Sequence, residues 1–431
     1  MNKNKLGMGS VLLLGINGII GSGIFLLPNQ AAKLMGTASI FVLIFDALLV
    51  ISIALCFAQA ATYFDKDGGP YLYAQDAFGE FIGFEVGFVT WAVRMIAEAT
   101  MAVAFETALV ATFPSAEPYK NLIISALIIG LAIMNILGAQ VSKVVNNIIT
   151  VSKLLPLVLF VAIGIFFIHQ NNFTPLFPHG TYQKGAFAQA AILMFYAFTG
   201  FEGLAVAAGD MKNAKQNLPK AIIIVIICVA SFYILIQIVT TGILGSSLAQ
   251  ANAPIQTAFA HIAGQFGKAL VAAGTLLSTG GLLVASSYIT PRSGVALAES
   301  GIMPPLLKKR NRYNAPWVSI IISMIITLLI AWSGTFGFLA QISAISRFAQ
   351  YIPTCLAVIV FAHTKTRQPQ SFHLFGGPVI PIIAVLVSVW LLFQVNTQQL
   401  LIGLGALLVA IPLYLIMKAY LIWGHKNKQS L

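Results

Sequence analysis

The sequence predicts an all-α protein that crosses a membrane many times, and three observations lead to this fold class. Of the 431 residues, 58% are hydrophobic and only 8% are charged, whereas soluble domains carry roughly 25% charged residues. The apolar residues gather in about twelve runs that are long enough to cross a bilayer as helices. Two of these runs are interrupted by glycines in mid-membrane, where irregular backbone survives only beside protein or a watered cavity.

Composition and motifs exclude several other classes. The 24 Lys and Arg outnumber the 12 Asp and Glu, but they lie between the apolar runs, so the expected partner is the lipid bilayer and not nucleic acid. The cysteines stand singly and the histidines lack metal-ligand spacing, so no disulfide or metal site is expected. No nucleotide-binding, hydrolase or zinc-protease motif occurs, and we predict neither a cofactor nor enzymatic activity.

The first half of the chain contains five predicted spans. The first, at 9–34, resembles a signal peptide, but it is too long and lacks a cleavage site, so it is expected to remain as a span. The others cover residues 39–63, 81–113, 121–137 and 144–169. A polar hinge is expected at 65–79, and a polar loop at 170–184 ends this half.

The second half repeats the pattern. Its spans cover residues 185–210, 221–244, 268–299, 317–333 and 336–363, and two more follow at 379–395 and 399–423. A short surface helix is expected at 249–266. Residues 1–431 therefore form a single transmembrane domain of twelve predicted spans.

The two glycine-broken spans are the first and the sixth. Gly18, Gly21 and Gly23 interrupt the first, and Gly200 and Gly203 interrupt the sixth, and glycine weakens a helix more than any residue except proline. Breaks at matching positions of two halves indicate an inverted repeat with the binding site between them. The span order and these breaks predict repeats at 9–169 and 185–363, with 379–423 as an addition.

The distribution of Lys and Arg predicts the orientation. If the N-terminus is cytoplasmic, the outside loops hold little beyond Lys120, Lys184 and Lys268. The inside set is much larger: Lys66, Lys143, Lys212, Lys215, Arg292, Lys308, Lys309, Arg310, Arg312, Lys365, Arg367, Lys418, Lys426 and Lys428. We therefore expect a multi-pass protein of the cell membrane with both termini in the cytoplasm.

The break in the first span offers amide donors. If the chain unwinds at Gly21, the N–H groups of Ser22, Gly23 and Ile24 can face a carboxylate from a helix N-terminus. For one such motif, close packing of small residues against another helix is the more common explanation. A second glycine break in the sixth span makes the binding interpretation the stronger one.

The break in the sixth span offers acceptors. Unwinding around Thr199 and Gly200 would free carbonyls, including those of Tyr196 and Thr199, to accept from an ammonium group. Tyr196 could cover the ligand as a lid, although a single ring such as Tyr196 or Phe198 more often faces lipid or core. Amides for a carboxylate and carbonyls for an ammonium together fit the backbone of an α-amino acid.

Ionisable residues inside spans are functional candidates because they are costly in lipid. This set comprises Asp46, Arg94, Glu98, Glu106, Lys153, Glu202 and Arg347. Arg94 and Glu98 are four residues apart and are expected to neutralise each other; their roles and that of Arg347 stay open. Lys153 has no neutralising sequence neighbour, so it could change protonation during a cycle or snorkel to the cytoplasmic headgroups. Glu202 could titrate or hold the unwound backbone by hydrogen bonds.

Four segments resemble the amino acid–polyamine–organocation superfamily of permeases. They are GIIGSGIFLLP at 18–28, GGPYLYAQDAFG at 68–79, GFEGLAVAAGDMKNAKQNLPKAI at 200–222 and PRSGVALAESGIMP at 291–304. The resemblance implies a LeuT-like 5+5 fold with two additional C-terminal helices, alternating access, and a substrate held between the first and sixth spans.

The resemblance also implies roles for single residues. Ser22 and Gly23 match amides that hold the substrate carboxylate, and Ile19, Tyr196 and Thr199 match carbonyls that take the amine. Glu202 matches an acid that couples to pH or gating in some members. Lys153 resembles the lysine that replaces a sodium ion in sodium-independent members, which would place it near the backbone of Gly18 and a hydroxyl of Ser286 or Ser287.

We therefore predict a sodium-independent secondary transporter of amino acids that works by proton symport or by exchange. A polyamine or cationic amino acid antiporter is the alternative within this class. A nutrient sensor that binds its ligand without moving it is a less favoured alternative. The sequence predicts neither the side-chain preference nor the stoichiometry, and it leaves the oligomeric state open.

Overall fold

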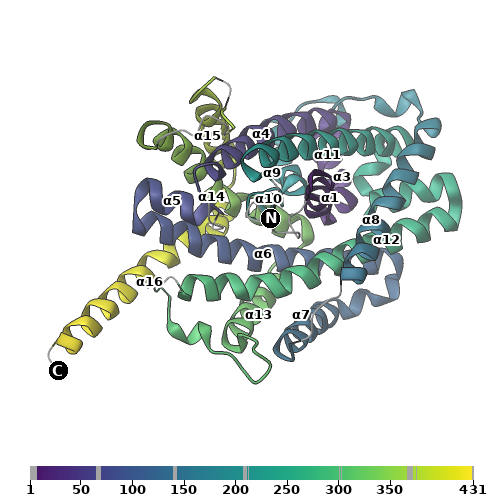
Figure 1. Cartoon of the computed structure of the whole chain (residues 1–431). Helices are drawn as coiled ribbons and strands as arrows, with labels where there is room; N and C mark the ends of the chain where they lie inside the picture. The colour runs from purple at the N-terminus through teal and green to yellow at the C-terminus, as the bar shows by residue number, and fades with distance from the viewer. Residues whose placement is uncertain are drawn as a thin grey trace.

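The computed structural model describes residues 7–64, 69–138, 143–206, 211, 213–299, 301, 303–365, 372–374 and 376–429. The described part of the chain is helical and contains no strand (Figure 1). Eight of its helices are long and apolar enough to cross a membrane, and four more apolar helices are shorter. The prediction of an all-α polytopic membrane protein is thus confirmed, while the twelve spans and the inverted repeat stay predictions.

The first predicted span consists of three helices, which are α1 (Met8–Ile19), α2 (Ser22–Leu26) and α3 (Pro28–Met35). Pro28 is the first residue of α3, a position that suits proline because its missing N–H has no intrahelical partner there. The rest of this half comprises α4 (Ser39–Ala61), α5 (Gly69–Phe78), α6 (Glu80–Thr112), α7 (Lys120–Ile136) and α8 (Lys143–Gly164).

The sixth predicted span is also divided, into α9 (Ala186–Phe195), the 3₁₀ turn η6 (Tyr196–Phe198) and α10 (Glu202–Val206). It is followed by α11 (Ala214–Leu244), α12 (Pro254–Glu299), α13 (Trp317–Trp332), α14 (Phe336–Thr364), α15 (Val379–Phe393) and α16 (Thr397–Gln429). A kink at Ala263 and Gly264 separates the predicted surface helix from the eighth span inside α12.

One expectation about local structure is wrong. The segment predicted to be a polar hinge contains the helix α5, whose residues Pro70, Tyr73 and Ala74 are buried. Tyr73 lies edge-on to Phe57 of α4, with ring centroids 6.5 Å apart, and also contacts Phe64. The aromatic residues of this segment therefore pack as a helix against the bundle, despite the glycine, proline and aspartate that suggested a turn.

The long helices α6 and α12 pack against each other, and α6 also contacts α14, α13 and α5 (Figure 1). On another side α11 packs along α4 and α1. Close approach depends on small residues, as membrane helix packing generally does. At Gly274 of α12, for example, a Cβ atom would lie 2.6 Å from Cγ of Pro156 in α8.

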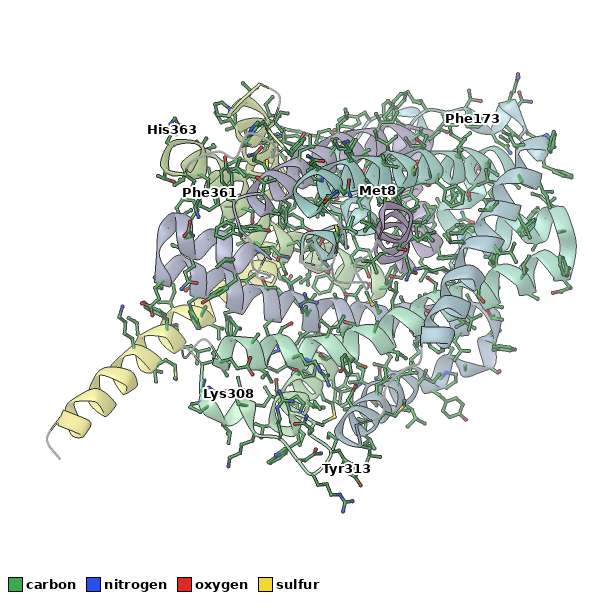
Figure 2. All side chains as sticks on the ribbon, in the orientation of Figure 1. Met8, Phe173, Lys308, Tyr313, Phe361 and His363 are labelled. Carbon is green, nitrogen blue, oxygen red and sulfur yellow. The ribbon has the colours of Figure 1, made fainter. Side chains whose placement is uncertain are left out.

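The outer surface is unusually apolar. Large hydrophobic side chains that are more than half exposed include Phe41, Leu48, Leu386, Phe393 and Leu415. Such an extended apolar surface is a liability in water but matches lipid chains. Charged and polar residues lie elsewhere, as in the loop between α12 and α13, where Lys308 and Tyr313 project at the edge of the molecule (Figure 2). Of the basic residues used to predict orientation, Lys66, Lys212 and Arg367 lie outside the described residues.

Candidate substrate site

The first span is broken at Ile20 and Gly21. Helix α1 ends at Ile19, Ile20 is extended with ψ 104°, and Gly21 is extended with φ −138° and ψ −152°. Helix α2 restarts at Ser22, so the amides of Ser22, Gly23 and Ile24 form its first turn, where N–H groups have no intrahelical partner. The segment is therefore interrupted where the glycines indicated, and the role of these amides in holding a carboxylate stays a prediction.

The sixth span is broken at Thr199 and Gly200. Thr199 is extended with ψ 153°, and Gly200 has φ +113°, a conformation that favours glycine. The break is held locally, because the Thr199 hydroxyl donates to the Tyr196 carbonyl at 2.7 Å and the Gly200 amide donates to Oε2 of Glu202 at 2.9 Å. Phe198 is fully buried against the ring of Tyr233, with centroids 5.3 Å apart.

The two breaks touch each other, and α1, α9 and α10 lie together in Figure 1. A Cβ atom on Gly23 would lie 2.7 Å from Cα of Ala197, and one on Gly200 would overlap the carbonyl oxygen of Gly18. Glycine is needed at both positions because of this close approach. Beside the contact, Oγ of Ser22 lies 3.0 Å from the hydroxyl of Tyr196, so the phenol reaches the first turn of α2.

Lys153 of α8 holds the break in the first span. Its side chain is fully buried, and Nζ donates to the carbonyls of Asn17 at 2.6 Å and Ile20 at 2.7 Å, on either side of Gly18. The structure does not support the alternative in which this lysine extends to the lipid headgroups, because its side chain is buried against α1. The two carbonyl oxygens accept hydrogen bonds from the ammonium group in place of water, and such bonds allow a charged side chain to be buried inside the helix bundle.

Tyr233 of α11 is a residue of the site that the sequence did not predict. Its hydroxyl lies 3.3 Å from the Ile19 carbonyl and 3.1 Å from the Ala197 carbonyl, so it bridges the two breaks. The side chain is fully buried. The only sequence signal is a tyrosine in an otherwise largely aliphatic span, which is weak, because buried tyrosines commonly occur in cores.

Two of the carbonyls predicted to receive an ammonium already have protein donors. The Ile19 carbonyl accepts from Tyr233, and the Tyr196 carbonyl accepts from Thr199. The Tyr196 carbonyl also accepts from the Thr199 amide at 3.2 Å, so both of its lone pairs are occupied, whereas the Ile19 carbonyl has a second lone pair that a ligand donor can use. The roles of Ile19, Tyr196 and Thr199 in binding stay predictions.

Glu202 is the centre of a charged cluster beside the break. Its carboxylate forms an ion pair with Arg347 of α14 and accepts from the hydroxyl of Tyr351 at 3.0 Å. Together with the bond from the Gly200 amide, these contacts connect α10 to α14. Arg347, whose role the sequence left open, is therefore a partner of Glu202.

Other predicted residues have different partners from those expected. Among the described residues, Arg94 and Glu98 do not form the expected ion pair, and Glu98 is hydrogen-bonded to Thr290 instead. Ser286 lies 3.4 Å from the Thr290 hydroxyl. Ser287 accepts from Asn135 at 3.1 Å and donates to the Val284 carbonyl at 2.9 Å. The hydrogen bonds of both serines therefore lead to Thr290, Asn135 and Val284 and not to Lys153.

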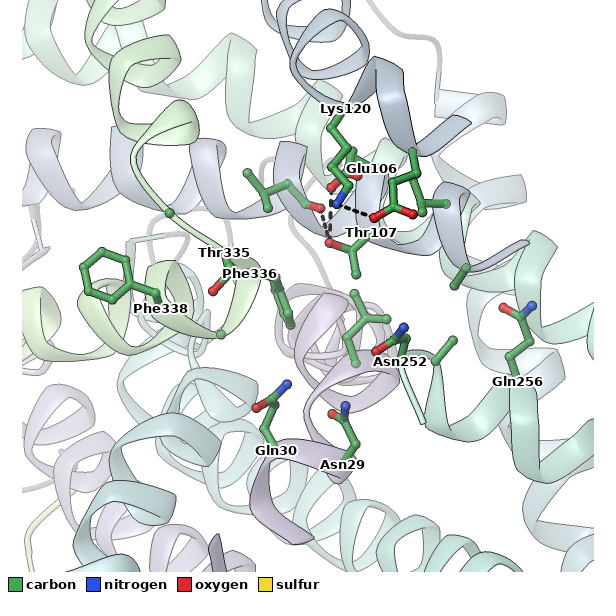
Figure 3. Close-up of a pocket in the computed structure, with 18 of the residues that line it drawn as sticks. Asn29, Gln30, Glu106, Thr107, Lys120, Asn252, Gln256, Thr335, Phe336 and Phe338 are labelled. Carbon is green, nitrogen blue, oxygen red and sulfur yellow. Dashed lines mark hydrogen bonds and ion pairs between the residues drawn. The ribbon is translucent and has the colours of Figure 1, made fainter. Parts of the chain in front are cut away.

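A large cavity, shown in Figure 3, is lined in part by the helices that flank the two breaks. Its volume is about 1210 Å³, and its lining includes Leu26 of α2, Leu193 of α9 and Phe336 of α14. The ring of Phe336 packs edge-on against Tyr196, with centroids 6.0 Å apart. Phe336 of the cavity wall is therefore connected through Tyr196 to Ser22 in the first turn of α2.

Interrupted helices that meet inside an apolar bundle define a class of protein, the polytopic membrane transporters. Residues 6–428 match the amino acid permease family, so the chain belongs to that family, within the amino acid–polyamine–organocation superfamily. It is an amino-acid transporter of the membrane, and such permeases are not enzymes. The resemblance noted in the sequence is confirmed over nearly the whole chain.

Similar proteins include an uncharacterized transporter of Mycobacterium tuberculosis, 34% identical over 418 residues, which are 90% of this chain and 87% of the relative. The branched-chain amino acid permease of Bacillus subtilis is 25% identical over 434 residues, covering 96% and 93% of the two chains. The serine/threonine exchanger of Bacillus subtilis is 25% identical over 427 residues, covering 96% and 97%.

Proposed function

We propose that the protein is a sodium-independent transporter of neutral amino acids that works by alternating access. The observation that carries the proposal is the contact between the two interrupted helices, with the first-turn amides of α2 beneath the phenol of Tyr196. We also propose the LeuT-like 5+5 repeat with two further C-terminal spans, because the breaks fall at matching positions of the two halves.

In this proposal the substrate carboxylate binds the amides of Ser22, Gly23 and Ile24, where the helix N-terminus favours an anion. The ammonium group donates hydrogen bonds to the carbonyl oxygens of Ile19 and Thr199, and at the Tyr196 carbonyl it replaces one of the two donors that Thr199 supplies. The bond between Ser22 and Tyr196 must open to admit the carboxylate, so Tyr196 acts as the lid.

Sodium independence is supported by Lys153. A sodium ion at a helix break is coordinated by freed carbonyls, and here the ammonium of Lys153 contacts the carbonyls of Asn17 and Ile20. A lysine can release and rebind a proton, whereas a bound sodium ion carries no proton to exchange. Lys153 is thus our candidate for coupling uptake to protons, and exchange of amino acids is the other possible mode.

A neutral substrate is favoured over a polyamine or a cationic amino acid. Two relatives are named for branched-chain amino acids and for serine and threonine. In addition, Arg347 is buried beside the break in the sixth span, and Arg94 lies close enough to interact with it electrostatically. Two guanidinium groups near the site disfavour a second positive charge on the ligand.

The orientation predicted from Lys and Arg places the cavity on the outside. Its rim contains Pro114 and Glu117 after α6, Asn252 before α12, and Ser333 after α13, which belong to loops predicted to be external. The Lys308–Arg312 segment belongs to a loop predicted to be cytoplasmic. We therefore propose that the structure is open to the outside and that both termini are cytoplasmic.

Uptake into proteoliposomes tests this function. Radiolabelled leucine, serine and threonine are expected to accumulate, and unlabelled neutral amino acids are expected to compete better than arginine, lysine or spermidine. Replacing sodium by potassium on both sides should leave the rate unchanged. Uptake that requires sodium, or binding of neutral amino acids without any uptake under a pH gradient or with internal substrate, would contradict the proposal.

A further inference from the structure

Two arginines lie one helical turn away from a hydrogen bond that joins α6 to α14. The Thr90 hydroxyl of α6 lies 3.2 Å from Oε1 of Gln350 in α14. Arg94 follows Thr90 by four residues and Arg347 precedes Gln350 by three, and side chains three or four positions apart share one face of a helix. Both arginines therefore lie on the faces with which the two helices pack together, and their charges interact.

The guanidinium groups of these arginines are short of acceptors. Nε of Arg94 and Nε of Arg347 are both buried, and neither has a hydrogen-bond partner within the described part of the chain. A buried donor without an acceptor has lost its water and gained nothing in return, and the cost is greater for a charged group. Most buried polar atoms have a partner, so two such donors on facing helices need an explanation.

The nearby carboxylates do not balance the two positive charges. Glu202 is the ion-pair partner of Arg347, and its second oxygen already accepts two hydrogen bonds. Glu98, one turn from Arg94 on α6, is hydrogen-bonded to Thr290 of α12 instead. Arg94 forms no ion pair with any residue that the structure describes, and a buried charge without a counter-charge is strongly unfavourable. The pair of arginines therefore fits an anionic ligand.

The space between the helices favours a small anion. Neither arginine lines the large cavity, and the axes of packed helices lie only about 8–10 Å apart, with side chains filling most of the gap. A guanidinium group has five N–H donors and no acceptor. Chloride is monatomic, carries one negative charge and accepts from several N–H groups at once, so it matches both the charge and the room.

We propose that Arg94 binds a chloride ion between α6 and α14, with Arg347 contributing its positive charge from the facing helix. The ion balances the two guanidinium groups and connects α6 to the cluster in which Arg347 holds Glu202, beside the break in the sixth span. The site is separate from the first-turn amides of α2. It goes beyond the proposed function, because it does not depend on which substrate the protein carries.

Binding of radioactive chloride to the purified full-length protein in nanodiscs tests the site. In gluconate buffer the wild type should bind chloride saturably. Arg94→Gln should bind at least about tenfold more weakly, because the charge-assisted hydrogen bonds of the guanidinium group are lost. Arg312→Gln, at an exposed arginine between α12 and α13, is the control and should bind as the wild type does. Absent binding by the wild type, or unchanged binding by Arg94→Gln, overturns the site.

Thermal unfolding gives a second measurement, which distinguishes an anion site from a merely structural arginine. Replacing gluconate by chloride at constant ionic strength should raise the unfolding temperature of the wild type, since a ligand that binds the native state stabilises it. In gluconate, Arg94→Gln should be at least as stable as the wild type, because a charge that repels Arg347 is gone, and chloride should not stabilise it further. A variant that is destabilised equally in both buffers contradicts the proposal.

Arg94→Met provides an independent variant should Arg94→Gln fail to fold, because it also removes the charge and suits an apolar bundle; the same results are expected. If acetate binds to the wild type and chloride does not, the choice of chloride is overturned. Chloride binding is measured without any transport substrate, so it is independent of the proposed function. Normal amino acid uptake together with absent chloride binding refutes the site alone, and the reverse result refutes the proposed function alone.

Discussion

The main chain of Gly200 lies directly against the carbonyl oxygen of Gly18, so the two interrupted helices meet through their backbones. No side chain separates them, and Gly200 has a positive φ that favours glycine. The contact places the donors of one helix next to the acceptors of the other. A substrate held by both would therefore sense a small relative movement of either helix.

Gly200→Ala tests this contact. The added methyl group overlaps the Gly18 carbonyl and is strained at φ +113°, so we expect uptake to be lost and the melting temperature to fall. Gly203→Ala is the matched control, because a Cβ atom there has nothing within 4 Å. Proteoliposome uptake and thermal unfolding are measured for both, and equal effects in the two variants would contradict the prediction.

Lys153→Ala removes the donor to the Asn17 and Ile20 carbonyls. We expect uptake driven by a pH gradient to fall at least tenfold, because two buried carbonyls lose a charge-assisted bond worth roughly 1.5–3 kcal/mol. Lys220→Ala, an exposed lysine at the start of α11, is the control. If a folded Lys153→Ala protein shows unchanged pH-dependent uptake, Lys153 does not couple uptake to protons.

Tyr196 is expected to act through both its ring and its hydroxyl. Tyr196→Phe keeps the contact with Phe336 and removes only the bond to Ser22, so it should alter affinity modestly. Tyr196→Ala should weaken substrate binding by at least tenfold or let substrate leak. Kinetics and efflux from loaded proteoliposomes distinguish the two, and wild-type behaviour of Tyr196→Ala would exclude a lid.

The ion pair between Glu202 and Arg347 predicts non-additive effects. Arg347→Gln leaves the Glu202 carboxylate without its cation and should destabilise the protein by roughly 3–5 kcal/mol, the range for breaking a buried pair. The double variant Glu202→Gln/Arg347→Gln should be more stable than that single variant. Chemical unfolding of the wild type, the two single variants Glu202→Gln and Arg347→Gln, and the double variant gives the coupling energy. If the changes in the free energy of unfolding simply add, the two residues are not coupled.

Tyr233→Phe removes the hydroxyl between the Ile19 and Ala197 carbonyls. We expect a loss of roughly 1–3 kcal/mol in the free energy of unfolding, the cost of leaving buried acceptors unsatisfied, and slower uptake. Tyr182→Phe, at an exposed tyrosine, is the control. If both variants unfold at the wild-type midpoint, the hydrogen bonds of the Tyr233 hydroxyl do not stabilise the protein.

Much of the fold could be predicted because its signals are local. Long apolar runs indicate spans, and the glycine-rich segments at 18–23 and 200–203 mark where the helices are interrupted. Within these segments Gly21 and Gly200 stand at the interruptions, whereas Gly18, Gly23 and Gly203 are helical. The segment that forms α5 was misjudged because proline and glycine suggest a turn, while the same proline fits the first turn of a helix. Burial of Tyr73, which decides between the two, depends on α4 and is not visible locally.

The partners of the site residues could not be predicted in the same way. Tyr233 and Ile19 are 214 positions apart, and Arg347 and Glu202 are 145 apart. Their pairing depends on how each helix is rotated about its axis, which several packing contacts decide together. Arg94 and Glu98 have the right spacing for a helical ion pair, yet Glu98 bonds to Thr290 of α12 because that helix packs against the same face.

The size of the cavity lined by Phe336 has a consequence for inhibition. At about 1210 Å³ it exceeds the usual size of a small-molecule pocket, and it is bounded by segments of α3, α6, α12 and α14. A rigid compound that filled it would keep these helices apart and hold the protein in the conformation in which this cavity is open. Such a blocker need not resemble a nutrient, and its selectivity among related permeases would come from the rim.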